Sequence, residues 1–597
     1  MSIAALKKLT LIGPAAEHDA TLAGLQEAGV MHLLPLNPGE AEPEDRVDRE
    51  AEEAYKALRF LAVVPKPRRQ VRSDPNFDVQ AFVSRVLHLK DALRVARDRR
   101  DALAERLSRM RPWGDIEFPP LESLAGQRLW FYQLPLKHRA ALKAVRLPWQ
   151  IVGRDARFAY VVVLAPEEPE PDLLPISRTH LGSKPASRLA AELEDTEVEI
   201  ETLLGERMAL TRYLTLLRAN LSEAETAAER AFADRQTLQD PDLFAVQGWV
   251  PSDRVAEIEQ TFAERGLAVL MEEPRASETP PTLLEQPSAD GAGVDLATFY
   301  QPPHYRAWDP SRLLIASFAL FFAMIVADAA YGAIVGLGLL VYWRPLGRTP
   351  ALKAWRLMGL YLAGATVLYG MVVGSYLGFA PPPGGALDAI AFLDLNDFET
   401  MMALSIIVGV LHLSYANFMA FRVKPTRSRF ANLGWIAILF GGVAVWLSDM
   451  SGPVYGLGVA LLLGGVLTIM AYASDRPVTA PRDWLWRGVD ALKGVTGMMG
   501  MFGDVLSYMR LFALGLASAS LAITFNDLSQ TAMASGSGFG VLGAVLILVI
   551  GHLLNFALAM MSGVVHGLRL NFIEFYKWGL PEEGTVFRAF ARKEVRE

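Results

Sequence analysis

The pattern of apolar and polar positions divides the chain into two unlike parts. As far as about Arg306, short apolar stretches alternate with segments rich in Glu, Arg, Asp and Pro, whereas long apolar runs dominate from Leu313 onward. A helix needs about 20 mostly apolar residues to span the hydrocarbon core of a bilayer. The pattern therefore predicts an elongated soluble α+β arm over residues 1–308, a helical polytopic membrane domain over 309–580 and a tail over 581–597.

Within the arm, alternation and helical spacing predict three small α/β regions. Residues 1–36 read as a βαβ-like unit, and a similar unit is expected near 243–274, beginning at Val246-Gln-Gly-Trp-Val-Pro251. A third region near 115–175 shows strand-like segments and one helix. The predicted elements are the strands Leu6–Ile12, Val30–Leu34, Arg128–Leu134, Trp149–Gly153 and Tyr160–Ala165 and the helices Glu17–Ala28 and Lys137–Val145.

Two long tracts of heptad-like spacing flank the third region. Such spacing puts one apolar seam on each helix. The tracts have similar lengths, so we expect residues 78–111 and 187–232 to form an antiparallel coiled-coil hairpin with the α/β domain at its tip. Ordinary helix cores would show the same spacing, and this alternative stays open. The seams are Phe82, Val86, Leu89, Leu93, Ala96, Leu103, Leu107 and Met110, broken by Arg100, and Leu189, Leu193, Ile200, Leu203, Leu210, Leu214, Leu217 and Leu221, broken by Thr196 and Arg207.

Basic residues occur in alternate loops of the apolar half, and this asymmetry predicts its topology. Segments near 344–356, 422–429, 474–493 and 588–596 contain several Lys or Arg, while 380–399, 449–452 and 526–537 contain none. By the positive-inside rule the first set is cytoplasmic. A cytoplasmic arm then requires an even number of spans before Arg344, so residues 311–344 should be two short helices that turn near Asp328 on the outer side. Eight spans result, near 311–328, 329–344, 354–379, 400–421, 431–448, 453–472, 490–525 and 539–578, with both termini cytoplasmic.

The last two spans are too long to cross a membrane upright, and glycines mark the third span for close packing. About 36 residues at ~1.5 Å each make a helix of about 54 Å, against a core of about 30 Å, so spans seven and eight should tilt steeply. Gly370, Gly374 and Gly378 recur at four-residue spacing, which is typical of helix–helix contact in membranes.

Composition narrows the chemistry. The chain has 597 residues, no cysteine and a net charge of −7, which sums over two unlike parts. Disulfides and thiolate metal sites are excluded, and the first residues lack the order of a secretory signal. The sequence contains no P-loop, no H-E-x-x-H and no dinucleotide-binding glycine motif. We therefore expect a cytoplasmic arm with a mechanical or recognition role, and no cofactor, metal or nucleic acid.

Two arginines, Arg510 and Arg569, lie deep in the last two spans. An arginine inside a span costs at least ~2.5–3.5 kcal/mol on insertion scales and is expected to be functional. The open alternative is an internal ion pair, with Asp504, Asp328 or Glu574 as partner. At about 100° per residue, Arg510 shares its helix face with Gly503, Ser507, Ala513 and Ala517, and Arg569 shares one with Gly551, Asn555, Ser562 and His566.

The two faces predict different environments. The residues around Arg510 are all small, so this face can approach another surface closely. The residues beside Arg569 form a polar stripe down an otherwise apolar helix, which we expect to line a water-filled path because lipid would reject it. A dry hydrogen-bonded seam is the alternative for the stripe.

The segments around these arginines resemble a known family. Ser507-Tyr-Met-Arg-Leu-Phe-Ala-Leu-Gly-Leu-Ala517 and His566-Gly-Leu-Arg-Leu-Asn-Phe-Ile-Glu-Phe575 are similar to the last two helices of the large membrane stator subunit of V-type and A-type rotary ATPases, called subunit a, or subunit I in prokaryotes. Weaker matches follow in the family's order: Trp249-Val-Pro251, Asp309-Pro310, Asp328-Ala-Ala-Tyr-Gly332, Gly374-Ser-Tyr-Leu-Gly378 and Leu404-Ser-Ile-Ile-Val-Gly-Val-Leu-His412.

The resemblance implies a fold and roles for particular residues. It implies eight helices against a rotating ring of proteolipid subunits, with Arg510 as the family's essential arginine and Arg569 as its secondary one. Eukaryotic relatives carry acidic residues where this chain has Ala559 and Thr496 or Gly497. The cytoplasmic half-channel must then use other groups, for which the candidates are Asp504, Ser507, His566 and Glu574. The outer half-channel candidates are Asp328, Tyr331, His412 and also His552.

Taken with the resemblance, the chain is expected to be a non-catalytic subunit of an ATP-linked rotary pump for protons or sodium ions in a prokaryotic plasma membrane. The implied partners are the proteolipid rotor ring, peripheral stalk subunits, the soluble ATPase head with its rotor subunits, and membrane lipid. A secondary ion transporter would show an internal repeat with broken helices, and no repeat relates spans 1–4 to spans 5–8. A membrane-anchored coiled-coil sensor would not need two deep arginines in over-long helices.

Overall fold

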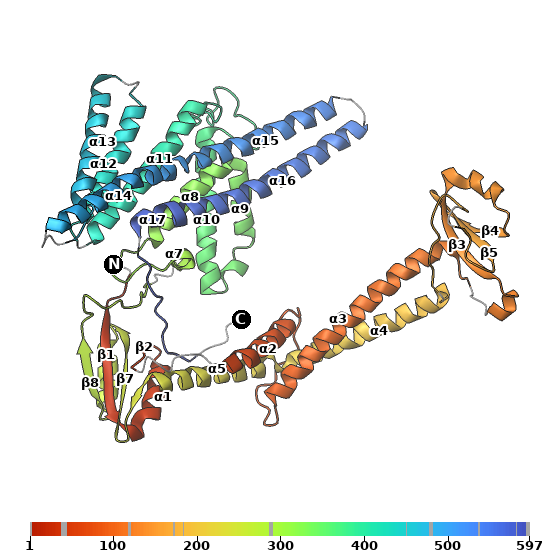
Figure 1. Ribbon diagram of the computed structural model, residues 1–597, viewed down its shortest axis with the longest axis horizontal. Helices are drawn as coiled ribbons and strands as arrows, with labels where there is room; N and C mark the ends of the chain where they lie inside the picture. Colours follow the sequence, from red (N-terminus) through yellow and green to blue (C-terminus); the bar gives the residue numbers. More distant parts are fainter. Residues whose placement is uncertain are drawn as a thin grey trace. The chain divides into compact units, whose positions relative to one another are not determined.

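The chain folds into two compact units, each built from separate stretches of sequence. The computed structural model describes residues 3–36, 45–116, 121–170, 173–182, 184–285, 291–424, 426–448, 451–476, 481–534, 538–580 and 582–592 (Figure 1). Unit 1 comprises Met1–Ala15, Val30–Leu34 and Gln239–Ala589, and unit 2 comprises Ala16–Gly29, Pro35–Leu238 and Phe590–Glu597. Unit 1 thus holds the apolar helices together with strands from both ends of the expected arm.

The sheet of unit 1 is built from strands far apart in sequence. β1 (Leu6–Pro14) lies antiparallel to β7 (Leu243–Pro251) and to β8 (Ala268–Glu272), and β2 (His32–Leu34) lies antiparallel to β7. The order is therefore β2-β7-β1-β8. A two-residue strand, β6 (Leu238–Gln239), and the helix α6 (Val255–Ala263) complete this part of the chain.

The units expected near 1–36 and 243–274 are therefore one sheet, which corrects the prediction of two. β7 lies between β1 and β2, so the first two strands do not pair with each other. The strands themselves were recognisable because Leu9 and Leu11 alternate with more exposed neighbours and are fully buried. Their partners lie more than 200 residues away, and local alternation carries no information about such pairing.

Unit 2 contains a helical hairpin with a small sheet at one end (Figure 1). The helices α3 (Val79–Met110) and α4 (Ala186–Leu210) pack side by side. Between them the chain forms the sheet β3-β5-β4, whose strands agree with the sequence to within two residues. The bounds are Arg128–Pro135 for β3, Trp149–Arg154 for β4 and Phe158–Ala165 for β5, and the helix expected at 137–145 is a 3-10 helix, Leu136–Ala144.

The second heptad tract is two helices rather than one, which corrects the expected 187–232. It breaks at the 3-10 turn Thr211–Tyr213 into α4 and α5 (Leu214–Gln236). A helix that the sequence analysis did not identify, α2 (Asp45–Ala62), packs here, with Leu58 and Leu61 buried against α3 and α5. Arg207, a break in the apolar spacing, donates to the carbonyl oxygen of Phe60 (3.1 and 2.5 Å) and lies over its ring. The irregularity in the seam is thus where α2 docks.

The apolar half of unit 1 is a bundle of helices (Figure 1). Within the described residues, six helical stretches are long and apolar enough to cross a membrane: Pro350–Val373, Phe398–Val423, Arg429–Trp446, Gly452–Tyr472, Arg482–Met533 and Gly538–Gly579. Two shorter apolar helices, α8 (Ser311–Val326) and α9 (Ala329–Val341), precede them. The first four of the six stretches are α10 (Pro350–Val373), α11 (Phe398–Val423), α12 (Arg429–Trp446) and α13 (Gly452–Tyr472). The fifth is formed by α14 (Pro481–Leu506) and α15 (Met509–Met533), and the sixth contains α16 (Gly538–Arg569) and α17 (Tyr576–Gly579). The short helix α7 (Gly291–Tyr300) precedes α8, and α1 (His18–Ala28) belongs to unit 2.

The turn between α8 and α9 is held by side-chain and backbone contacts. Ala327 has a left-handed backbone (φ 49°), and Asp328 caps α9 by accepting from the backbone N–H groups of Ala330 and Tyr331 (2.9 and 3.0 Å). The Ser375 hydroxyl also donates to Asp328 (2.9 Å). These contacts explain why residues 311–344 form two helices, with the break where the sequence predicts it.

The last two spans differ from the expected 490–525 and 539–578. α14 begins at Pro481 and α15 ends at Met533, with a break at Ser507 and Tyr508. Residues 526–533, expected in an outer loop, are therefore helical. The start of α14 was missed because four charged residues interrupt the apolar residues of its first ten positions: Arg482, Asp483, Arg487 and Asp490. α16 runs on into a π-helix, Leu570–Phe575, and then into α17.

The segment after α17, expected as a tail, is bonded to the rest of unit 1. We call residues 582–588 the C-terminal strap. Thr282 and Thr585 share a backbone hydrogen bond (2.7 Å), and the N–H of Gly584 donates to the carbonyl of Pro302 (2.9 Å). In β2, Nδ1 of His32 lies within hydrogen-bond distance of both the backbone N–H (3.0 Å) and the carbonyl oxygen (3.1 Å) of Arg588. The strap therefore ties the end of the membrane helices to the sheet.

Candidate functional site

Arg510 lies in the first turn of α15, just after the break that separates α15 from α14. The break is anchored by Tyr508, which is fully buried and whose hydroxyl bonds Nδ1 of His412 on α11 (2.8 Å). Gly409 allows this contact, because a Cβ there would lie 2.6 Å from the ring of Tyr508. The position of Arg510 along α15 is thus set by a packed tyrosine two residues earlier.

The guanidinium of Arg510 has unused donor capacity. The side chain is half-buried, and its Nη1 is buried with no hydrogen-bond partner among the described residues. Arginine carries five N–H donors in a fixed fork, and a buried charge without a partner is costly. The arrangement therefore favours an acceptor that comes from outside this chain.

The face of α14 and α15 around Arg510 is small and open. Gly503, Ala513 and Ala517 are exposed, and Ser507 is half-buried with its hydroxyl bonded to the carbonyl of Gly503 (3.1 Å). A Cβ added at Gly503 would meet no atom within 4 Å in the described structure. The small residues of this face are therefore open to solvent in the described structure.

Three further residues predicted from sequence gather near Arg510, and we call the four together the arginine cluster: Arg510, His566, Arg569 and Glu574. Arg510, Arg569 and Glu574 lie close enough for electrostatic interaction with one another, and His566 lies within such range of both arginines. Arg569 Nε lies 3.8 Å from Glu574 Oε1, the ion pair held open as an alternative above. Glu574 is buried, with Oε2 lacking a hydrogen-bond partner in the described chain.

The π-helix explains how Arg569 and Glu574 meet. Residues five apart on an α-helix differ by about 140° in direction, given 3.6 residues per turn. The wider turn of Leu570–Phe575, with its i to i+5 bonding, brings the two side chains to the same side. Single turns of this kind are frequent at functional sites. No sequence motif predicted this π-helix.

Asp504 is held away from free solvent by α17. Its Oδ2 accepts from Lys577 Nζ (2.8 Å) and from Trp578 Nε1 (2.7 Å). Trp578 in turn packs edge-on against Trp435 of α12, with ring centroids 5.0 Å apart. Asp504 therefore fastens the end of α14 to the segment that follows the π-helix.

A second polar group, the tyrosine network, joins α9, α15 and α16. We define it as Tyr331, Ser518, Asn526, His552 and Asn555. The Tyr331 hydroxyl bonds His552 Nδ1 (2.9 Å) and accepts from Asn555 Nδ2 (3.2 Å). His552 Nε2 bonds Asn526 Oδ1 (2.9 Å), and Asn555 also donates to the carbonyl of Ser518 (2.9 Å). Asn526 and Ser518 were missed, although each is a polar residue in an apolar run.

Two residues have other neighbours than the sequence analysis expects. His412, expected with Asp328 and Tyr331, instead stacks on Phe575 (centroids 4.3 Å apart) and bonds Tyr508, so it supports the arginine side. Asn555, expected on one water path with His566, is 1% exposed and belongs to the tyrosine network. Helical spacing gives the direction of a side chain but not the neighbour it meets. Ser562, between them on α16, is half-buried.

We expect the polar stripe of α16 to be wet at one end and dry at the other. In a chain without native cysteine, cysteines at Ser562 and His566 should react with a small charged thiol reagent, while one at buried Asn555 should not. A cysteine at Leu554, 51% exposed, is the control, because in hydrocarbon no thiolate forms. Labelling rates in membranes measure this. Equal inertness at 562, 566 and 554 contradicts a water path.

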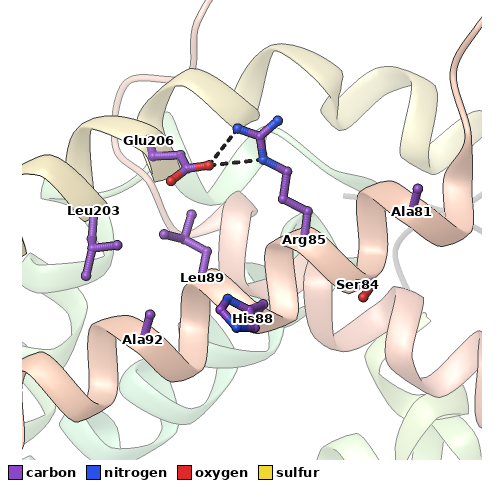
Figure 2. A pocket seen from close by; sticks show the side chains of 8 residues that line it. All are labelled: Ala81, Ser84, Arg85, His88, Leu89, Ala92, Leu203 and Glu206. Carbon is purple, nitrogen blue, oxygen red and sulfur yellow. Dashed lines mark hydrogen bonds and ion pairs between the residues drawn. The ribbon is translucent and has the colours of Figure 1, made fainter.

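Unit 2 offers a shallow groove of about 580 Å³ between α3 and α4 (Figure 2). Arg85 reaches across it to Glu206 Oε1, with Nη2 at 2.6 Å and Nε at 3.0 Å. Both side chains are solvent-exposed, and such surface pairs contribute about 0–1 kcal/mol. The groove is thus bridged by one exposed ion pair between the two helices. Its lining residues are Ala81, Ser84, Arg85, His88, Leu89, Ala92, Leu203 and Glu206.

Proteins of similar sequence match between two thirds and nearly all of the chain. V-type ATP synthase subunit I of Chlamydia muridarum is 25% identical over 617 residues, covering 91% of this chain and 92% of that protein. V-type ATP synthase subunit I 1 of Treponema pallidum is 25% identical over 618 residues, covering 96% and 97%. A-type ATP synthase subunit I of Methanocaldococcus jannaschii is 26% identical over 454 residues, covering 68% and 64%.

Comparisons with protein-family models and with solved structures do not extend these sequence matches. No protein-family model matches the chain. A crystal structure of the cytoplasmic N-terminal domain of subunit I, homolog of subunit a, of V-ATPase, aligns at 19% identity over 45% of this chain and 100% of that chain. Its TM-score of 0.24 is too low to carry an argument about the fold.

Proposed function

We propose, from the premise that this chain is homologous to subunit I of the V-type and A-type ATP synthases, that it forms the stationary ion path of a rotary ATPase. The relatives confirm the family resemblance drawn from the motifs around the two arginines. The observation that carries the proposal is Arg510, whose buried Nη1 has no acceptor in the described chain and whose helix face is small and open. Such a face suits a surface that slides past it.

The proposed occupant of this face is a ring of proteolipid subunits, each with one carboxyl group at mid-membrane. A carboxylate is costly in lipid, so the group travels neutral, carrying its ion. Beside Arg510 the opposite charge favours the ionised form, and the ion is released there. Arginine cannot be deprotonated in proteins, so Arg510 cannot relay a proton between the two sides of the membrane. ATP chemistry would belong to separate soluble subunits.

The two polar groups are proposed as the two access routes. On the cytoplasmic side we assign His566, Glu574 and Ser507, which lie around Arg510. On the outer side we assign the tyrosine network, because His552 and Tyr331 form a continuous hydrogen-bonded chain through α9, α15 and α16. Histidine and a hydroxyl can pass a proton between them, and the amides of Asn526 and Asn555 hold His552 and Tyr331 in place for this exchange.

Three of the predicted channel residues are better assigned to holding the path in place. Asp328 uses its oxygens to cap α9 and to bind Ser375. Asp504 is occupied by Lys577 and Trp578. His412 supports Tyr508 at the break before Arg510. We therefore propose that these three position the reacting groups and do not carry the ion.

We propose eight spans, with α8 and α9 as two short spans that turn on the outer side and both termini in the cytoplasm of a prokaryotic cell. The basic loops support this orientation. The soluble regions would then hold peripheral stalks and, through them, the ATPase head. The hairpin of α3 and α4 supports this role, because paired helices form a stiff spacer.

The proposed topology predicts the outcome of cysteine labelling in intact cells. Leu387→Cys, in a loop without Lys or Arg and 43% exposed, should be labelled by a membrane-impermeant thiol reagent. Arg348→Cys, exposed in a basic loop, should be labelled only after the cells are permeabilised. Because the chain lacks native cysteine, the parent protein is the blank. Labelling of Arg348→Cys in intact cells would reverse the proposed orientation.

Native purification tests the function itself. If the chain is the stationary part of a rotary pump, it should co-purify with a small proteolipid that has a carboxyl group in the middle of a membrane helix, and with an ATP-hydrolysing head. The measurement is mass spectrometry of the complex together with ATPase assay. A monodisperse, intact chain without any proteolipid would instead favour a secondary transporter or a membrane-anchored sensor.

A further inference from the structure

The beginning of α14 carries basic and apolar residues on its exposed side. Its acidic residues, Asp483 and Asp490, lie on the half-buried side of the helix together with Arg487. Its other basic residues, Arg482 and Lys493, lie on the exposed side. The exposed side also has an apolar stripe, whose members are Trp484 (65% exposed), Leu485 (69%) and Leu492 (65%). This is the pattern of a helix that lies in a membrane–water interface.

The acidic groups around this segment already have partners. Asp490 accepts from the Ser474 hydroxyl (2.8 Å) and pairs with Arg476 (3.1 Å). Asp475 accepts from the backbone N–H of Ser428 (2.6 Å). Among the residues that the structure describes, Arg482 and Lys493 have no ion-pair partner. The excess positive charge is therefore directed outward.

The arginines of this region rest on aromatic rings. Arg476 lies over Trp486 (5.6 Å to the centroid) and Arg487 over Trp484 (5.8 Å). Arg487 donates to the backbone carbonyl of Arg476 (3.0 and 2.6 Å) and so uses no carboxylate. A guanidinium stacked on a ring keeps N–H donors at its edge, which suit phosphate oxygens. Arg427 lies over Tyr472 in the same way (5.1 Å).

These contacts join the ends of α12, α13 and α14 into one surface, because Ser428 bonds Asp475 while Ser474 and Arg476 bond Asp490. We call its basic residues the α14 patch: Arg427, Arg476, Arg482, Arg487 and Lys493. We propose that the α14 patch binds the phosphate headgroups of anionic phospholipids, while Trp484, Leu485 and Leu492 lie among their acyl chains. This proposal goes beyond the ion path and does not depend on it.

Charge and apolar area together favour a lipid over a soluble anion. Each Lys or Arg near an anionic membrane surface is attracted by about fivefold in affinity, and basic pockets at the cytoplasmic ends of membrane helices bind anionic headgroups. Tryptophan is enriched at the same depth. A soluble phosphate compound would leave the stripe of Trp484, Leu485 and Leu492 in contact with water.

The experiment uses the full chain in bilayers that contain equal amounts of phosphatidylglycerol and phosphatidylcholine. Lipids that stay bound after transfer to mild detergent are counted by native mass spectrometry. We expect phosphatidylglycerol to be retained at least about tenfold over phosphatidylcholine, because two basic residues at about fivefold each already exceed that ratio. Arg482→Gln with Arg487→Gln and Lys493→Gln should reduce the preference by about tenfold or more. Lysine in place of Arg482 and Arg487 should keep most of it.

Matched controls separate a site from a general charge effect. Arg344→Gln with Arg348→Gln and Lys353→Gln removes the same charge from another basic loop and should keep the preference. Added inorganic pyrophosphate should not displace the bound lipid, whereas about 0.5 M salt should weaken the preference through screening. No preference in the parent chain, an equal loss in the control variant, or displacement by pyrophosphate would each overturn the proposal.

Discussion

Replacing Arg510 with Ala or Gln is expected to abolish ATP-driven ion uptake while the complex still assembles. Assembly should survive because no acceptor in the described chain depends on the buried Nη1 of Arg510. Transport should not, because a nearby opposite charge shifts the ionisation of a carboxyl group by about 10- to 1,000-fold. We therefore expect coupled uptake to fall at least about 100-fold. Arg510→Lys should fail nearly as badly, since lysine can deprotonate when buried and lacks the planar fork.

Arg569→Ala is the matched comparison for this result. The Arg569 side chain is 48% exposed and already pairs with Glu574 at 3.8 Å, so we expect its loss to reduce uptake by about tenfold or less. Uptake into vesicles with the assembled mutant complex is the measurement, and ATP hydrolysis by the attached head reports assembly. Uptake near the parent rate in Arg510→Ala would remove the basis of the proposed ion path.

Adding one methyl group at Gly370 is expected to destabilise the membrane helices strongly. A Cβ there would lie 2.1 Å from the backbone nitrogen of Ala329 and 2.6 Å from the carbonyl carbon of Asp328. Both neighbours are backbone atoms of the turn between α8 and α9, so they cannot move aside alone. Overpacking of this kind costs typically about 1–3 kcal/mol and occasionally more. We expect Gly370→Ala to lower the thermal unfolding temperature in detergent by several degrees and to reduce yield.

Gly364→Ala provides the control on the same helix. Gly364 is exposed, and a Cβ there would meet no atom within 4 Å in the described structure. Alanine is the better helix former by about 1 kcal/mol, so this change should be neutral or slightly stabilising. Equal melting of the two variants would mean that the turn at Asp328 yields easily, in contrast to the packing described here.

The local elements were predictable wherever burial imposes a regular period. β1 alternates because one of its faces is buried, and β5 is a continuous apolar run because both of its faces pack on other residues. The helix α3 repeats apolar positions because it packs on α4. The order of the strands was not predictable, because β7 enters between β1 and β2 from more than 200 residues away. The helix α2 was missed although its buried residues recur at helical spacing and pack on α3 and α5: Ala54, Ala57, Leu58 and Leu61.

Individual site residues were predictable, but their grouping was only partly so. Charged and polar side chains in apolar helices are rare enough to be noticed singly, which is how Arg510, Arg569, Asn555 and His566 were found. Grouping depends on local departures from the ideal helix. The π-helix turns Glu574 toward Arg569, and the break at Tyr508 draws His412 away from the tyrosine network. A helical wheel drawn at 100° per residue shows neither the π-helix nor the break at Tyr508.

The C-terminal strap shortens the route by which force could travel through unit 1. Gly584 and Thr585 are bonded to residues 282 and 302, and Arg588 to His32 at the edge of the sheet. A pull on the sheet therefore reaches α17 and the π-helix, beside which Arg569 and Glu574 lie, without first passing through the other membrane helices in series. In a stationary part that resists torque, this short load path would keep the arginine cluster aligned while the rest of the bundle flexes.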